Sequence, residues 1–154
     1  MKSIRTWPRV ELAILLFAAW QARDLINAWQ HSPHDRLGWV ALLVWLTPPG
    51  LRIINPQADQ GANFYLLGAT IVCGLLGELT EVHFLNHVAL ALATGAWTRF
   101  SRRTWPWRLA AVSWMPIFGW WLADYSAGTV FIFRLALALA GCLSIWLIKK
   151  QGPP

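Results

Sequence analysis

The chain has 154 residues, of which 56% are hydrophobic and only 13% are charged, and its formal net charge is +6. Water-soluble domains usually carry about 25% charged residues, so this composition argues against one. The positive charge could indicate a nucleic-acid partner, but the basic residues lie beside long apolar runs, where they typically set membrane topology. The composition therefore predicts an all-α, polytopic membrane protein that lies in the lipid bilayer and binds no nucleic acid.

Six apolar segments follow one another, each close to the roughly 20 residues that cross a bilayer. They cover residues 9–30, 37–54, 62–80, 82–98, 105–123 and 126–148. Their continuous apolar character predicts helices, because the strands of a membrane barrel would alternate polar and apolar residues. The loops are short, so we expect residues 1–154 to form a single helical transmembrane domain. Proline is expected to break the second segment at Pro48 and Pro49 and to kink the fifth at Pro116.

Basic residues gather on one side of the six segments. With a cytoplasmic N-terminus, the cytoplasmic side carries ten of the thirteen Lys and Arg residues, namely Lys2, Arg5, Arg9, Arg52, Arg99, Arg102, Arg103, Arg108, Lys149 and Lys150. Arg36 then lies outside, and Arg23 and Arg134 lie within segments. This asymmetry predicts that both termini are cytoplasmic and that the protein is a multi-pass protein of the bacterial cytoplasmic (inner) membrane.

The stretch GELTEVHFLNH, residues 77–87, joins the third and fourth segments on the predicted outer side. Before the turn, small residues recur at intervals of four and end in an acid, at Ala69, Cys73, Gly77 and Glu81. After it, the same interval is repeated by His83, His87, Ala91 and Gly95. Small residues at this spacing let two helices approach closely in a membrane. The two rows therefore predict a tight hairpin with a polar outer end.

Further polar residues are expected near the same outer end. The predicted polar cluster consists of Glu78, Glu81, His83, His87, Asp124, Arg23 and Arg134. Charged residues within membrane segments normally pair, because lipid solvates them poorly. The expected acidic partners of the two arginines are Asp24, Glu78, Glu81 and Asp124. On this interpretation the cluster caps the hairpin and holds no metal.

Other chemistry stays open for this region. His83 and His87, four residues apart on one helical face, could bind a metal together with an acid of the cluster, or either could ligate haem or chlorophyll. Cysteine catalysis finds little support, because Cys142 lies away from every histidine and Cys73 lies near mid-membrane, where a thiolate is disfavoured. The sequence contains no HExxH or ExxH motif. No cofactor is therefore indicated by motif, and any cofactor stays unknown.

Three stretches of the sequence carry a resemblance to a known family: WQHSPHDRLGWVALLVWL, LLGATIVCGLLGELTEVHFLNHVALALATGAW and SWMP. In that order they resemble an early extracytoplasmic loop with the helix after it, the next hairpin, and the proline-bearing helix that follows in the exosortase/archaeosortase family of membrane proteins. The resemblance implies the fold of a multi-span cysteine peptidase that acts on C-terminal sorting tags at the outer face. The family's Ala-Cys-x-Gly-like motif and its later Arg and His have no counterpart here. The resemblance thus implies a truncated member that keeps the N-terminal helices and lacks the catalytic half.

These observations favour a non-enzymatic integral membrane subunit or scaffold of a bacterial membrane protein complex, with other membrane subunits as its partners. Two alternatives stay open. One is a membrane enzyme of the outer face, such as a sorting peptidase-like protein that acts through the Glu and His residues of the polar cluster. The other is a small transporter component that uses a cavity containing Arg23 and Arg134.

Overall fold

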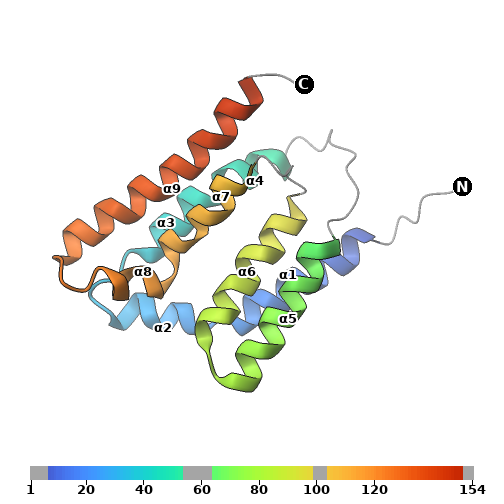
Figure 1. Ribbon diagram of the computed structural model, residues 1–154, viewed down its shortest axis with the longest axis horizontal. Coiled ribbons are helices and arrows are strands. Elements are labelled where there is room, and N and C mark those ends of the chain that lie inside the picture. Colours follow the sequence, from blue (N-terminus) through green and yellow to red (C-terminus); the bar gives the residue numbers. More distant parts are fainter. Residues whose placement is uncertain (1–6, 54–63, 99–103, 151–154) are drawn as a thin grey trace, which may run out of the picture. The chain divides into compact units, whose positions relative to one another are not determined.

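The computed structural model describes residues 7–53, 64–98 and 104–150, and every regular element among them is helical (Figure 1). The prediction of an all-α protein is therefore confirmed for this part of the chain. In chain order the elements are α1 (Trp7–Gln21), α2 (Asp24–His31), α3 (Gly38–Trp45), α4 (Thr47–Ile53), α5 (Phe64–Thr80), α6 (His83–Trp97), α7 (Trp105–Leu109), the 3₁₀ helix η2 (Ala110–Trp114), α8 (Pro116–Trp121) and α9 (Ala127–Lys150). These helices group into two compact units.

Unit 1 comprises residues 1–24 and 58–99 and contains α1, α5 and α6. α5 and α6 form an antiparallel hairpin, and α1 packs against both helices. Gln21, the last residue of α1, donates a hydrogen bond from Nε2 to the backbone oxygen of Gly74 at 3.2 Å. The end of α1 therefore lies beside the second half of α5. These two helices run in the same direction, and α6 runs against them (Figure 1).

The α5–α6 hairpin that we predicted is present, but α5 packs through a different face. Its buried residues are Leu67, Thr70, Gly74 and Gly77. Ala69 and Cys73 are only half-buried, and Glu81 is exposed. Each step of four residues turns about 40° beyond a full turn of helix, so a row with that interval winds around the helix. Residues separated alternately by three and four positions stay on one face of a helix. The four buried residues of α5 have this spacing.

The start of α6 completes the hairpin. His87 and Gly95 are buried as the predicted row requires, Ala91 is half-buried, and His83 is exposed. A Cβ atom at Gly77 would overlap the side-chain amide of Asn86, so the glycine permits the close approach of the two helices beside the turn. Glu81 has a φ of 57° in that turn, the left-handed conformation with which many helices end. It reverses the chain and does not extend a packing row.

Unit 2 comprises residues 25–57 and 100–154, and α3, η2 and α9 each pack against the other two at its centre. The Cys142 thiol, late in α9, donates to the backbone oxygen of Val44, near the end of α3, at 3.1 Å. Arg134, nearer the start of α9, forms an ion pair with Asp35, just before α3. α3 and α9 therefore run in the same direction.

Three buried tryptophans fill the interior of unit 2. The indole Nε1 of Trp45 donates to the backbone oxygen of Trp107 at 2.7 Å, and Nε1 of Trp107 donates to the backbone oxygen of Trp45 at 2.9 Å. The two rings are stacked, with their centroids 4.5 Å apart and an interplanar angle of 2°. Trp114 lies against Trp45 at a centroid distance of 5.8 Å. The reciprocal hydrogen bonds satisfy two polar N–H groups inside an apolar core and tie α7 to the end of α3.

Three of the six predicted segments are interrupted. The first divides into α1 and α2 at Ala22 and Arg23, the second into α3 and α4 at Leu46, and the fifth into α7, η2 and α8. Met115 is extended, with φ −76° and ψ 144°, because the residue before a proline is disfavoured in the helical region. The breaks near Pro48 and Pro116 agree with the prediction from proline. The break in the first segment was not predicted.

α9 contains the one stretch among the described residues, Ala127–Leu147, that is long and apolar enough by itself to cross a membrane. α1 and α6 have 15 residues each and α5 has 17. Such helices reach about 22 to 26 Å, less than a hydrocarbon core of about 30 Å. The helical character of the predicted segments is thus confirmed, whereas six complete crossings are not seen in the described helices. The basic residues Lys2, Arg5, Arg99, Arg102 and Arg103, which contribute to the predicted orientation, lie outside the described residues.

Candidate functional site

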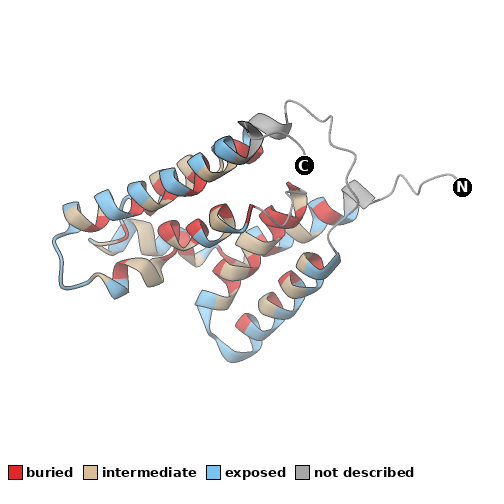
Figure 2. Cartoon of the chain, turned by 45° about the horizontal axis from the view of Figure 1, so that its top comes forward, coloured by how far each residue is buried: buried red, intermediate tan, exposed pale blue. Residues whose placement is uncertain are grey.

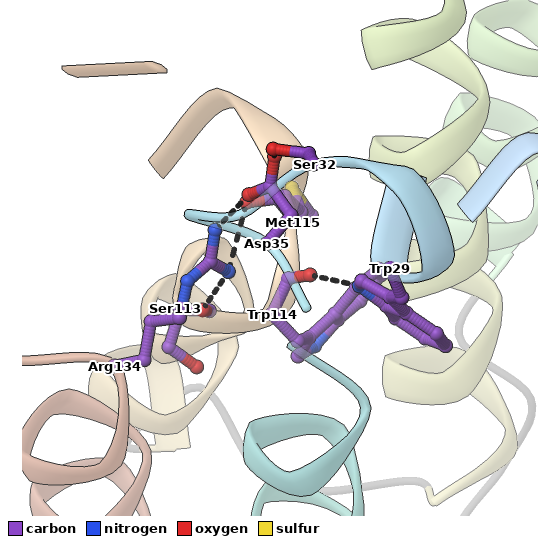
Figure 3. Close-up of polar contacts among 7 residues, drawn as sticks. All are labelled: Trp29, Ser32, Asp35, Ser113, Trp114, Met115 and Arg134. Carbon is purple, nitrogen blue, oxygen red and sulfur yellow. Dashed lines mark hydrogen bonds and ion pairs between the residues drawn. The ribbon is translucent and has the colours of Figure 1, made fainter. Parts of the chain in front are cut away.

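Arg134 is fully buried in unit 2 and is held by groups from two other elements. Its Nη1 donates to the backbone oxygens of Ser113 at 2.7 Å and Met115 at 3.2 Å, and its Nη2 forms an ion pair with Asp35 (Figure 3). Ser32 Oγ donates to the other carboxylate oxygen of Asp35 at 2.7 Å. The buried guanidinium is thus neutralised and largely hydrogen-bonded, as a buried charge requires.

The break before Pro116 creates the acceptors for this guanidinium. Carbonyl groups at the end of a helix have no partner within that helix, and η2 ends at Trp114 beside the extended residue Met115. The backbone oxygen of Ser113 is therefore available to Arg134, whereas the oxygen of Met115 accepts from the Phe118 N–H at 3.1 Å as well as from Arg134. The proline that follows η2 and the arginine that binds the oxygen freed there form one structural arrangement.

Gly119 on α8 allows the ion pair to form. A Cβ atom at this position would overlap both the Asp35 carboxylate and the Arg134 guanidinium. The neighbouring Phe118 places its ring centroid 5.4 Å from the centre of the guanidinium, a cation–π distance. α8 therefore closes over the pair with one residue that has no side chain and one that stabilises positive charge.

The partner of Arg134 differs from our expectation. We expected Asp24, Glu78, Glu81 or Asp124, and the structure places Asp35 there instead. The reason lies in the turns before α3, where the Asp35 N–H donates to the Ser32 oxygen at 3.2 Å and the Gly38 N–H donates to the Asp35 oxygen at 2.7 Å. These turns direct the carboxylate inward. Asp124, by contrast, is exposed.

A second polar centre, which is partly buried, lies in unit 1. His87 Nε2 lies 2.9 Å from Asp24 Oδ2, and His83 Nδ1 lies 3.9 Å from the same oxygen. His87 is buried, whereas His83 is exposed at the start of α6. Asp24 Oδ1 is buried and has no hydrogen-bond partner. The result is a carboxylate–imidazole pair with one unused carboxylate oxygen, an arrangement that can hold or transfer a proton.

The remaining members of the predicted polar cluster lie at the surface. Glu78 and Glu81 are exposed, on the last turn of α5 and in the turn that follows it. Arg23 is also exposed, with its guanidinium 5.0 Å from the centroid of the Trp20 ring. An exposed aromatic ring, and not one of the expected acids, is therefore the neighbour of Arg23. Because Arg134 is fully buried, it lines no open cavity that a transported substrate could enter.

Metal binding and cysteine catalysis find no assembled site in the described part of the chain. Among the described residues no group of three or more His, Cys, Asp or Glu side chains has an arrangement that could hold a metal ion, and this includes His83 and His87 beside Asp24. Cys73 is a half-buried free thiol on α5. Cys142 is buried, and its thiol donates to a backbone oxygen. Neither thiol is seen beside a histidine that could activate it as a nucleophile.

Comparison with protein-family models, with curated proteins and with solved structures finds no match for this chain. The resemblance to exosortases and archaeosortases therefore stays an expectation from the sequence. The features that bear on function are the two polar centres and the distribution of apolar side chains around them.

Proposed function

We propose that this protein is an integral membrane protein of the bacterial cytoplasmic membrane, with six membrane-embedded segments, and that it serves as a non-enzymatic subunit or scaffold of a membrane protein complex. The observation that carries the proposal is the distribution of residues on α9. Arg134 is fully buried, while Ile132, Leu139 and Leu143 are 66%, 50% and 58% exposed. A helix in water would expose the arginine and bury the leucines. In lipid the opposite arrangement is favourable, because charge must face protein and apolar side chains can face the hydrocarbon.

Other helices likewise have exposed residues beside buried ones along their length (Figure 2). Large apolar side chains are exposed on α1, α5 and α8, at Leu16, Phe17, Trp20, Ile71, Val72, Leu75, Leu79, Trp120 and Trp121. Soluble monomers rarely expose contiguous apolar patches of more than a few hundred Å². Lipid or neighbouring subunits would cover these faces, so a bilayer and membrane-embedded partners are the environment we propose.

Helix directions within each unit support alternating passage through the membrane. In unit 1, the first and third segments (α1 and α5) run in the same direction and the fourth (α6) runs against them. In unit 2, the second and sixth segments run together, as the contacts of Asp35 with Arg134 and of Val44 with Cys142 indicate. The fifth runs against them, because Trp107 at its start meets the end of α3 while Ser113 lies at Arg134. Segments that cross a membrane alternately would have these directions.

The contacts of the buried arginine support a non-enzymatic role. The Arg134 guanidinium forms an ion pair with Asp35 and donates hydrogen bonds to two backbone oxygens. Among the described residues no hydrogen bond joins either thiol to a base, which a sorting peptidase-like mechanism would need. An exosortase-like origin remains part of the proposal and rests on the three similar stretches of sequence.

One observation favours a second candidate, an enzyme of the outer face. In the His87–Asp24 pair a carboxylate lies 2.9 Å from one ring nitrogen, which is one element of the arrangement that a histidine general base uses. Complementation of a deletion strain separates the two functions. If the protein is an enzyme, a His87→Gln variant that accumulates normally in the membrane loses complementation and His83→Gln retains it. If it is a scaffold, both variants complement in proportion to their amounts.

Two experiments test the proposal itself. After alkaline carbonate extraction, the protein should remain in the membrane pellet; recovery in the soluble fraction would contradict membrane insertion. In a variant without Cys73 and Cys142, single cysteines at Pro33 and Asp124 should react with a membrane-impermeant thiol reagent in intact cells, and one at Arg102, which lies outside the described residues, should not. The reverse labelling would overturn the orientation.

The role as a subunit is tested by purification from its own membrane in mild detergent. We expect at least one other integral membrane protein to copurify in a fixed ratio through two different chromatographic steps. Recovery of the protein alone, at its full cellular amount and well folded, would contradict a role that depends on partners.

A further inference from the structure

A pocket in unit 2 has the features of an anion site. It has a volume of about 450 Å³ and is lined by Ile26, Trp29, Gln30, Arg36 and Trp39, from α2, the following loop and the start of α3. This volume lies within the range of about 300–1,000 Å³ that is usual for small-ligand sites. Under the predicted topology the pocket lies at the extracytoplasmic end of these helices.

One wall of the pocket is fixed by the fold. Trp29 donates from Nε1 to the backbone oxygen of Trp114 at 3.3 Å (Figure 3). A Cβ atom at Gly38 would overlap the Trp29 indole, so this glycine makes room for the ring. The indole is therefore held in position before any ligand arrives, and less conformational freedom is lost when one binds.

The Arg36 guanidinium supplies a positive charge that the described residues do not neutralise. Arg36 is exposed, and no acid in the described part of the chain lies within ion-pair distance of it. Its neighbour in sequence, Asp35, forms an ion pair with Arg134 and accepts a hydrogen bond from Ser32. Guanidinium groups bind phosphate through two parallel N–H bonds. The Gln30 amide, on the same pocket, can add a further donor.

We propose that this pocket binds the phosphate group of an anionic phospholipid. The choice of a lipid over a soluble phosphate follows from Ile26 and Trp39, which are 57% and 46% exposed beside the arginine. Indole rings favour the headgroup level of a bilayer, and an exposed isoleucine can contact the glycerol and the first part of an acyl chain. The inference rests on the proposed membrane location, but carbonate extraction tests that location separately.

Native mass spectrometry of the detergent-purified protein tests the site. The ligands are short-chain phosphatidylglycerol, phosphatidylcholine of the same chain length, and inorganic phosphate. We expect phosphatidylglycerol to bind at least tenfold more tightly than phosphatidylcholine, and Arg36→Gln to remove that preference. Arg23→Gln, which changes an exposed arginine outside the pocket, should leave the preference intact.

The outcomes separate the sources of the phosphate. Inorganic phosphate that binds as tightly as phosphatidylglycerol, and is lost in Arg36→Gln, supports the anion site but assigns it to a soluble phosphorylated compound. Equal binding of phosphatidylglycerol by the wild type and by an Arg36→Gln variant with unchanged melting temperature overturns the proposal. If Arg36→Gln is unstable, the milder variant Gln30→Leu should still weaken phosphatidylglycerol binding, and unchanged binding there also contradicts the site. A protein that resists carbonate extraction and yet shows no lipid preference would remove the lipid site without affecting the membrane proposal.

Discussion

Arg134 on α9 and Asp35 in the turn before α3 form a buried ion pair that connects two segments 99 residues apart in the sequence. A guanidinium in an apolar interior is tolerated only when an anion and hydrogen-bond acceptors surround it. Here the acceptors are the backbone oxygen of Ser113, in the last turn of η2, and that of Met115, directly after it. The pair thus joins α9, η2 and the α2–α3 loop at one point.

Removing one partner of this pair should be more damaging than removing both. We expect Arg134→Leu or Asp35→Leu to lower the free energy of unfolding by about 3–5 kcal/mol, because each leaves the other charge buried and unpaired. The double variant should recover part of that loss. Chemical unfolding in detergent measures the difference, and Asp124→Asn, which changes an exposed acid, is the control. Strictly additive losses in the double variant would show that the two charges do not interact.

Two glycines of α5 provide a matched test of the hairpin. A Cβ at Gly77 would overlap Asn86, whereas a Cβ at Gly68 has no neighbour within 4 Å. Gly77→Ala should therefore destabilise the protein, by about 1–3 kcal/mol for an overpacked contact. Gly68→Ala should be neutral or stabilising by up to about 1 kcal/mol, because alanine favours a helix over glycine. Thermal unfolding of the two variants side by side measures this, and equal melting temperatures would contradict the close approach of α5 and α6.

The reciprocal hydrogen bonds between Trp45 and Trp107 should be sensitive to loss of a single N–H group. Trp45→Phe removes one donor and leaves a buried backbone oxygen without it, which costs about 1–3 kcal/mol in addition to the lost ring volume. The control is Trp146→Phe, since Trp146 is exposed on α9. Unfolding followed by far-UV circular dichroism compares the variants. A similar effect of both substitutions would mean that ring size alone accounts for the result.

The two histidines of α6 should respond differently to substitution. His87→Ala removes the partner of a partly buried carboxylate and should lower the free energy of unfolding by about 1–3 kcal/mol, whereas the exposed His83→Ala should have little effect. Elemental analysis of the wild type and both variants adds a second measurement. Zinc, copper or iron in a fixed ratio in the wild type, lost in both variants, would contradict the structural role and assign a metal to the pair.

Several features could be predicted because they follow from local chemistry. The continuous apolar segments predict helices, and the position of Pro116 predicts the interruption that appears as η2 and the extended Met115. The requirement that Arg134 has an acidic partner also follows from the cost of burying a charge. Predicting these features requires neither the register of the helices nor knowledge of which residues contact each other in the fold.

The identity of that acidic partner could not be predicted in the same way. It depends on the turns between Ser32 and Gly38, which direct Asp35 toward α9, and several acids of the sequence were equally suitable by charge. Helix register was also difficult. The residues Gly74 and Gly77 are buried while Cys73 is only half-buried, because the contacts of Gln21 and Asn86 select the face of α5. Small residues lie on both faces, so their spacing alone did not decide between them.

On α9 the arginine faces the interior of the protein and the leucines face outward, and spin-label accessibility at Leu139 in proteoliposomes tests most directly whether that outward face lies in lipid. A nitroxide is attached to a single cysteine at Leu139, in a chain without Cys73 and Cys142, with a label at the exposed Asp124 as the aqueous reference. Molecular oxygen concentrates in the hydrocarbon, whereas a nickel chelate stays in water. We predict that the label at Leu139 collides much more often with oxygen than with the chelate, and that the label at Asp124 shows the reverse. Strong relaxation of the Leu139 label by the nickel chelate would place this face of α9 in water and contradict the account.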